Sequence, residues 1–323
     1  MLALTEVNVW HWIGFIACVL VLLALDLAVL NRRAKADGYL QAIRWTAVWF
    51  SLAMLFALGL KSWRGNKEAL EFLAGYLVEL SLSMDNVLVM ALVFTYFSIP
   101  SEHQHRVLFW GILGALVMRG MLIGVGVALV VWLHWVLYLF GAFLVWSGIR
   151  ILLVKTKVDP EKNRIVRWTR KIIPVAPELD GRRFSTSWQG RKALTRLALA
   201  LLVIETSDLL FALDSVPAVF AVTTRPFIVF TSNVFAILGL RSLYFVLAGA
   251  MRSFRYLKAG LSVVLVLFGL KMLLDPHDRP PHWFQAQIPI GASLATVAGI
   301  LLISIILSVI AGRRGGNHEA TGP

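Results

Sequence analysis

Cysteine is almost absent from this sequence: Cys18 is the only one among 323 residues, so no disulfide framework is available within one chain. Charge is also scarce, because charged residues make up 15% of the chain where a soluble domain has about a quarter. Acidic residues number 18 against 31 lysines and arginines, while hydrophobic residues reach 59%. These shortages exclude an ordinary soluble domain and predict a membrane protein.

Apolar stretches long enough to cross a bilayer, about 20 residues each, recur along the chain. Nine are present, at approximately 10–30, 41–60, 70–97, 106–131, 133–154, 195–222, 227–250, 256–274 and 287–311. We expect helices throughout, because backbone N–H and C=O groups must be paired where there is no water. The sequence therefore predicts an all-α, polytopic membrane bundle of about nine transmembrane helices.

Basic residues concentrate in alternate loops. Twelve of them lie between Lys155 and Arg196, whereas the loops of the opposite side together carry five. Because cytoplasmic loops are rich in lysine and arginine, this pattern predicts an N-terminus outside and a C-terminus inside. It also accounts for the net charge of +13, so binding to nucleic acid is not expected. Within the basic loop, residues 163–173 fit either an interfacial helix or a solvated linker.

A short acidic pattern occurs twice. An acid, five residues, a second acid, a small polar residue and a valine appear at Glu79–Val87 and again at Asp208–Val216. Two further pairs of segments match in the same order: Ile112–Gly114 with Ile237–Gly239, and Gly148–Leu153 with Gly269–Leu274. Chance similarity between leucine-rich helices is the alternative. Since each unit holds three helices, a duplication predicts an inverted repeat, a plan common among secondary transporters.

These landmarks divide the chain into five predicted segments. They are two peripheral helices in 1–69, the first three-helix repeat in 70–154, the basic cytoplasmic loop 155–194, the inverted second repeat in 195–275, and the ninth helix with a cytoplasmic tail in 276–323.

Five carboxylates interrupt the third and sixth apolar stretches: Glu79, Asp85, Glu205, Asp208 and Asp214. A charged group at the centre of a membrane helix costs roughly 2.5–3.5 kcal/mol on insertion scales. The two nearby arginines, Arg119 and Arg241, cannot neutralise five acids. Protonation or a bound cation must remove the remaining negative charge, unless the acids serve only as structural partners of the arginines and of helix carbonyls.

Helix geometry limits how the acids meet. Residues six apart are rotated by about 120° on a straight helix, so Glu79 and Asp85 face different directions. For all the acids to line one cavity, the helices must kink or unwind. Pro217 provides a cause in the second copy, because it leaves the carbonyl of Leu213 without its amide donor.

The ligand types indicate which cation would bind. Carboxylates, the amide of Asn86 and the hydroxyl of Ser215 are hard oxygen ligands, which suit Mn²⁺, Mg²⁺ or Ca²⁺. The predicted metal ligands are Glu79, Asp85, Asn86, Glu205, Asp208, Asp214 and Ser215. Secondary candidates are Ser83, Arg119, Asn233 and Arg241.

At these positions the sequence resembles the TerC family of integral membrane proteins, and within it the Alx-type members. The matching residues are Glu79, Ser81, Leu82, Asp85 and Asn86 in one motif; Asp208, Phe211, Ala212, Asp214, Ser215, Pro217 and Ala218 in a second; and 231–241 in a third. The resemblance implies a nine-helix protein of the bacterial inner membrane, related to the lysine-exporter superfamily. It also implies links to manganese efflux, metal supply to exported proteins and tellurite resistance. Arg225 departs from the family pattern, which often has an acid there.

The function we expect is export of a divalent metal ion, first of all Mn²⁺, by alternating access, with protons as a coupling ion. The alternative is a membrane assembly or metalation factor that does not transport and whose loop 155–194 docks a translocation or maturation partner. An enzyme is not expected, because no nucleophile–base pair or phosphate-binding loop stands at a suitable position.

Overall fold

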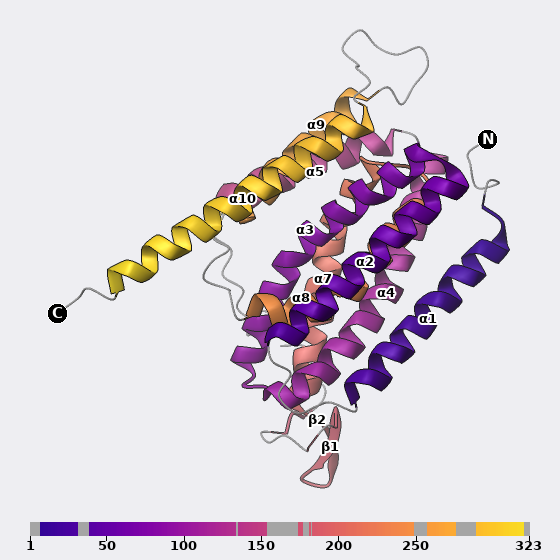
Figure 1. The fold of residues 1–323 in the computed structure, drawn as a ribbon. Helices are drawn as coiled ribbons and strands as arrows, with labels where there is room; N and C mark the ends of the chain where they lie inside the picture. The colour runs from indigo at the N-terminus through magenta and orange to yellow at the C-terminus, as the bar shows by residue number, and fades with distance from the viewer. Residues whose placement is uncertain are drawn as a thin grey trace.

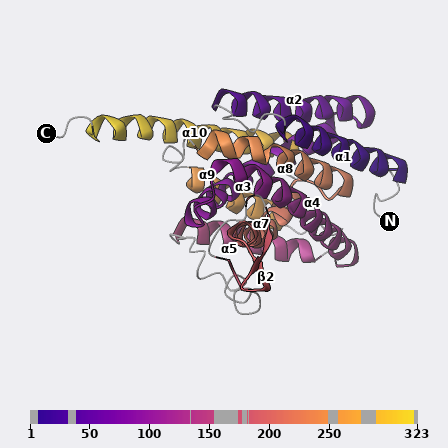
Figure 2. The same ribbon diagram turned by 90° about the horizontal axis from the view of Figure 1, so that it is seen from below.

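The computed structural model describes residues 7–31, 39–133, 135–153, 174–176, 181, 183–248, 257–275 and 289–319. Within these residues there are nine α-helices and one antiparallel pair of short strands. The helices form an elongated bundle from which α10 extends at one side (Figure 1). Seen from below, α1 and α2 lie along one side of the bundle and α5 along the other (Figure 2).

The elements follow the predicted apolar stretches closely. The first five helices are α1 (Val9–Asn31), α2 (Tyr39–Arg64), α3 (Asn66–Tyr96), α4 (Ser101–Trp132) and α5 (Val136–Leu153). The remainder are β1 (Ser185–Trp188), β2 (Arg191–Leu194), α7 (Arg196–Phe220), α8 (Pro226–Ala248), α9 (Leu257–Leu274) and α10 (Ile290–Glu319). The prediction of a polytopic helical bundle is therefore confirmed for the described residues, including the break between the fourth and fifth helices, while the all-α prediction misses the two short strands.

Six of the described helices are long and apolar enough to cross a membrane: α2, α3, α4, α5, α8 and α10. The described apolar part of α1, Val9–Leu25, is shorter. Helix α7 falls outside this set because it carries Arg196 and three carboxylates. These features establish a polytopic helical membrane protein.

Burial separates the helices into interior and peripheral ones. We compare the buried share of an apolar 18-residue stretch in each helix. In α8 94% of this stretch lies inside the bundle and in α3 67%, whereas in α10 only 17% does. Helix α3 packs against α7 and α8, and α4 packs against the same two helices. The acidic helices α3 and α7 are therefore in direct contact at the centre of the bundle.

Helices α5 and α9 approach each other at small residues. A Cβ atom added to Gly269 would lie 2.6 Å from the carbonyl oxygen of Gly141, and one added to Gly148 would lie 2.8 Å from that of Ser262. The Ser262 hydroxyl also donates a hydrogen bond to the Gly148 carbonyl. Small residues allow such close backbone contact in membrane helices, where dispersion forces and interhelical hydrogen bonds hold the bundle together.

A β-hairpin precedes α7 and is a correction to the purely helical prediction. Strands β1 and β2 pair from Ser185 with Leu194 to Trp188 with Arg191. Gln189 and Gly190 form the turn, both with positive φ, as a two-residue hairpin loop requires. The predicted interfacial helix at 163–173 lies outside the described residues.

Candidate functional site

A buried arginine joins the two acidic helices. Arg119 of α4 is only 1% exposed and forms ion pairs with Glu79 of α3 and Asp208 of α7. Its Nη2 lies 2.8 Å from Asp208 Oδ1, and its Nε lies 3.1 Å from Asp208 Oδ2. This bidentate geometry is the strong form of arginine–carboxylate pairing.

Two further side chains complete what we call the central cluster, which comprises Glu79, Asn86, Arg119, Asp208 and Ser215. The Asn86 Nδ2 donates to Asp208 Oδ1 at 2.8 Å, and the Arg119 Nη1 donates to the Ser215 hydroxyl at 3.4 Å. All five residues are buried. The cluster thus unites polar groups of α3, α4 and α7, and it has one cation for two carboxylates.

Several oxygens at or beside the central cluster have no hydrogen-bond partner among the described residues. They are Glu79 Oε2, Ser83 Oγ, Asn86 Oδ1 and Glu205 Oε2, and all four are buried atoms. A buried acceptor without a partner costs about 1–3 kcal/mol, so these atoms favour a further donor or a cation. They are also the hard oxygen type that Mn²⁺, Mg²⁺ and Ca²⁺ prefer.

Glu205 lies one turn before Asp208 on α7, so the two side chains share a face of that helix. Its carboxylate lies against Gly114 of α4: a Cβ added to Gly114 would be 2.6 Å from Glu205 Oε2. The space for the carboxylate therefore depends on the absence of a side chain at position 114. This glycine belongs to one of the segments that the repeat pattern matched.

Asp85 and Asp214 lie apart from the central cluster. Asp214 accepts a hydrogen bond of 2.8 Å from the Ser147 hydroxyl of α5. Asp85 is half-buried, and Lys258 of α9 lies close enough to act on its charge. Both acids therefore face the α5–α9 side of the bundle.

The helices containing the acids are continuous. Helix α3 runs from Asn66 to Tyr96 and α7 from Arg196 to Phe220, so the expected unwinding does not occur in the described residues. Pro217 lies inside α7, three residues before its end at Phe220, and the helix continues through it although the proline cannot donate to the carbonyl of Leu213. Across the described residues, no three His, Cys, Asp or Glu side chains are grouped closely enough to hold a metal ion. Because the helices are continuous, the five acids face two directions. Glu79, Glu205 and Asp208 lie at or beside the central cluster, and Asp85 and Asp214 face α5 and α9.

The secondary candidates occupy neighbouring positions. Asn233 and Arg241 are buried in α8, which contacts both α3 and α4, and Ser83 is buried in α3 between Glu79 and Asn86. The structure therefore places every predicted polar residue on the four helices α3, α4, α7 and α8.

A second charged group was not predicted, and it lies at the beginning of α3. Arg225 forms ion pairs with Glu68 and Glu71, and the Thr223 hydroxyl donates to Glu71 Oε2 at 2.6 Å. Arg64 also pairs with Glu68, at 3.0 Å. A cleft beside this group is lined by Trp63, Arg64, Lys67, Glu68 and Arg225. The sequence signal was the spacing of three residues between Glu68 and Glu71, which places them on one helix face.

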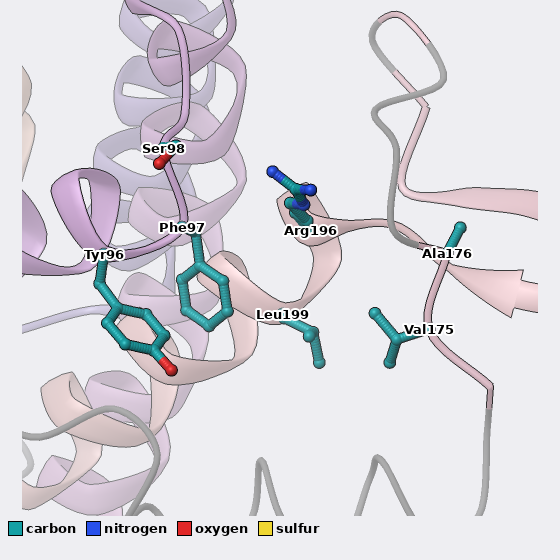
Figure 3. Close-up of a pocket in the computed structure, with 7 residues that line it drawn as sticks. All are labelled: Tyr96, Phe97, Ser98, Val175, Ala176, Arg196 and Leu199. Atoms are coloured by element: carbon teal, nitrogen blue, oxygen red, sulfur yellow. The ribbon is translucent and has the colours of Figure 1, made fainter.

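Another cleft, of about 610 Å³, lies at the opposite end of α3. It is lined by Tyr96, Phe97, Ser98, Val175, Ala176, Arg196 and Leu199 (Figure 3). Arg196 brings a positive charge and the lining contains no carboxylate, so this cleft does not suit a cation.

The nine helices of the described residues, with the charged groups buried between them, define an integral membrane protein with a polar interior site. The chain belongs to the TerC family: the family described as integral membrane protein TerC matches residues 64–315. This range covers α3 to α9 and hence every residue of the central cluster.

Curated relatives extend the similarity over nearly the whole chain. An uncharacterized membrane protein of Myxococcus xanthus is 48% identical over 314 residues, covering 97% of this chain and 96% of its own. Proteins with the provisional name membrane-bound redox modulator Alx are 44% identical in Photorhabdus laumondii (92% of this chain, 94% of the relative) and 42% identical in Escherichia coli K12 (92% and 93%). No solved structure matches the chain.

Proposed function

We propose that the protein exports a divalent metal ion across the bacterial inner membrane by alternating access. Mn²⁺ is the cation we favour, with Mg²⁺ and Ca²⁺ as alternatives. The central cluster carries the proposal: Glu79 and Asp208 both pair with Arg119 in a buried location, and hard oxygen atoms beside them lack partners within the described part of the chain. A site with surplus negative charge and oxygen ligands favours a hard divalent cation.

The proposed metal ligands fall into two groups along the path that the metal ion would take through the bundle. Glu79, Asn86, Asp208 and Ser215, with Glu205 beside them, would form the inner group, and Asp85 and Asp214 the second. Ser83 and Asn233 would be secondary ligands, and Arg119 and Arg241 are the cations predicted beside the acids. Protons are the coupling ion that we propose, because carboxylates left in a water-poor interior after release of the metal need another positive charge.

The contacts between α5 and α9 support an inverted repeat. Gly148 and Gly269 begin the two matched segments, and Gly141 and Ser262 each lie seven residues before them, so the two pairs occupy equivalent places in the repeat. Gly141 contacts Gly269 while Gly148 contacts Ser262. Such reciprocal contacts are the signature of a two-fold axis, and inverted repeats with a central site are the usual plan of alternating access.

Metal flux into vesicles tests the assignment. In proteoliposomes, we expect Asp85→Asn and Asp214→Asn each to reduce Mn²⁺ flux at least tenfold, because each variant removes a negative charge from the path. Glu102→Gln, at an exposed carboxylate at the start of α4, is the control and should leave the flux unchanged. Undiminished flux in both aspartate variants would rule out their role, and no flux with the unaltered protein would contradict export.

Gly114 provides a second test, since its missing side chain makes room for Glu205. Gly114→Ala should displace the flexible carboxylate while leaving the fold intact, and we expect Mn²⁺ flux to fall about fivefold to tenfold. Gly124→Ala is the matched control in the same helix, because a Cβ there meets nothing within 4 Å. Equal flux in the two variants would show that the position of Glu205 is unimportant for transport.

The alternative, a membrane assembly or metalation factor, gains support from the β-hairpin. Its tip has a partly exposed Trp188 beside the exposed Arg191 and Lys192, at the end of the bundle predicted to be cytoplasmic. Substitution of these three residues by serine separates the two functions. Loss of a bound partner with normal metal flux would leave export as the core activity, and loss of flux would connect the two.

A further inference from the structure

We infer that Arg119 is a tethered counter-ion that competes with the transported cation for Glu79 and Asp208. This inference depends on the proposed function, because it assigns to one residue the control of affinity at the same site. Arg119 belongs to α4, whereas the two acids belong to α3 and α7. One side chain therefore bridges the two helices that the cation would have to bridge.

The hydrogen bonds of Asp208 are the first argument for competition. Its Oδ1 accepts from Arg119 Nη2 and from Asn86 Nδ2, both at 2.8 Å, and its Oδ2 accepts from Arg119 Nε at 3.1 Å. An ionised carboxylate offers about four acceptor positions, so three are in use. One position on Oδ2 stays open, so a metal ion that binds both oxygens of Asp208 at about 2.0–2.6 Å would need positions that the guanidinium now holds.

Charge is the second argument. Glu79, Asp208 and Arg119 together carry one net negative charge. A divalent ion that replaces the guanidinium makes this group neutral, whereas a divalent ion added to it makes the group positive. Like charges a few ångströms apart in a poorly screened interior repel strongly, so exchange is favoured over addition.

Exchange also predicts selectivity for charge. A monovalent cation that displaced Arg119 would bring no additional charge to the carboxylates and would leave a buried guanidinium without its partners. A divalent cation brings one charge more. Arg119 thus lowers the affinity of the site for every cation that must displace it. A doubly charged ion still binds, and a singly charged ion of the same size does not.

The location of Arg119 connects binding to movement. Helix α4 packs against α7 and α8, which belong to the second repeat. When Arg119 pairs with Asp208, this buried ion pair connects α4 of the first repeat to α7 of the second. Displacement of the guanidinium by the metal releases this tie, and departure of the metal restores it.

Equilibrium binding of Mn²⁺ to the purified protein, measured by titration calorimetry, tests the inference. We expect Arg119→Gln to bind Mn²⁺ at least tenfold more tightly than the unaltered protein, because the competing cation is gone. A purely structural arginine would give the opposite result, weaker binding or none. Arg225→Gln is the matched control, since that arginine also pairs with two glutamates of α3, and its affinity should stay within twofold.

A double variant shows whether the tighter Mn²⁺ binding of Arg119→Gln comes from the negative charge of Asp208. Arg119→Gln with Asp208→Asn restores the original net charge of the group and should bind no more tightly than the unaltered protein. If Arg119→Gln accumulates poorly, thermal unfolding with Mn²⁺ replaces calorimetry. We then expect Mn²⁺ to raise the Tm of the variant more than that of the unaltered protein, and a variant that Mn²⁺ does not rescue would overturn the inference.

The outcomes separate this inference from the proposed function. Measurable binding by the unaltered protein with no gain in Arg119→Gln would overturn the role of Arg119 alone. Absence of binding in both proteins would overturn both proposals. Binding by Arg119→Gln alone would support competition and contradict metal binding by the native site.

Discussion

Replacing Gly269 with alanine is expected to destabilise the protein by at least about 3 kcal/mol, at the upper end of the usual cost of overpacking. The new Cβ would lie 2.6 Å from the carbonyl oxygen of Gly141 and 2.8 Å from the backbone nitrogen of Val145. Both neighbours are backbone atoms, so α5 and α9 must separate to make room. Thermal unfolding of the detergent-solubilised protein, followed by tryptophan fluorescence, measures the effect.

Gly299→Ala is the matched control for this substitution. Gly299 also lies within a membrane helix, α10, but a Cβ there meets nothing within 4 Å. Alanine favours the helix over glycine by up to about 1 kcal/mol, so the control should be neutral or slightly more stable. Equal stability of the two variants would mean that α5 and α9 are not in close backbone contact.

Substitution of Asp208 by asparagine is expected to lower Mn²⁺ flux at least a hundredfold while the protein still folds. The fold survives because Glu79 continues to pair with Arg119, which leaves the central cluster neutral. Transport fails because unit charges 4 Å apart interact by about 4 kcal/mol at an effective dielectric constant of 20, and a divalent ion loses about twice that attraction. A hundredfold loss needs only about 2.7 kcal/mol.

Flux into proteoliposomes measures this effect, with the Tm as the check on folding. The exposed Glu102→Gln variant serves again as the control, because it removes a negative charge at the beginning of α4. Native flux in Asp208→Asn would mean that the central cluster does not bind the transported ion. Lost flux together with a collapsed Tm would assign Asp208 to the fold instead.

The helices were predictable because a bilayer imposes a simple requirement on sequence. Every spanning segment must be apolar over about 20 residues, and this property is visible without any tertiary information. The end of α4 at Trp132 and the start of α5 at Val136 agree with the predicted break. Arg119 was also identified beforehand as a candidate partner of the acids, since arginines are rare inside membrane helices.

The arrangement of the acids was predicted only in part. Helical rotation alone separates Glu79 from Asp85, and the structure keeps that separation, with Arg119 near the former and Lys258 near the latter. The expected unwinding at Pro217 was wrong, because α7 runs through the proline to Phe220 and one missing amide donor did not interrupt it. Which helix each acid faces depends on packing, which periodicity does not contain.

Other features left weak signals in the sequence. The hairpin strands Ser185–Trp188 and Arg191–Leu194 are mostly polar, so they lack the alternation that marks a half-buried strand. Glu68 and Glu71 lie at the edge of an apolar stretch, where acids are common and attract little notice. The glycine contact of α5 and α9 depends on two helices meeting, and no single segment encodes it.

The glycine contact between α5 and α9 limits how the bundle can deform. The close backbone contact is joined by the hydrogen bond from Ser262 to Gly148, so these two helices are expected to stay together as a pivot. The rotation that the proposed alternating access requires is then expected at the interfaces of α3, α4, α7 and α8, which carry the buried charges. We therefore expect the α5–α9 contact to direct such a rotation towards the buried charges.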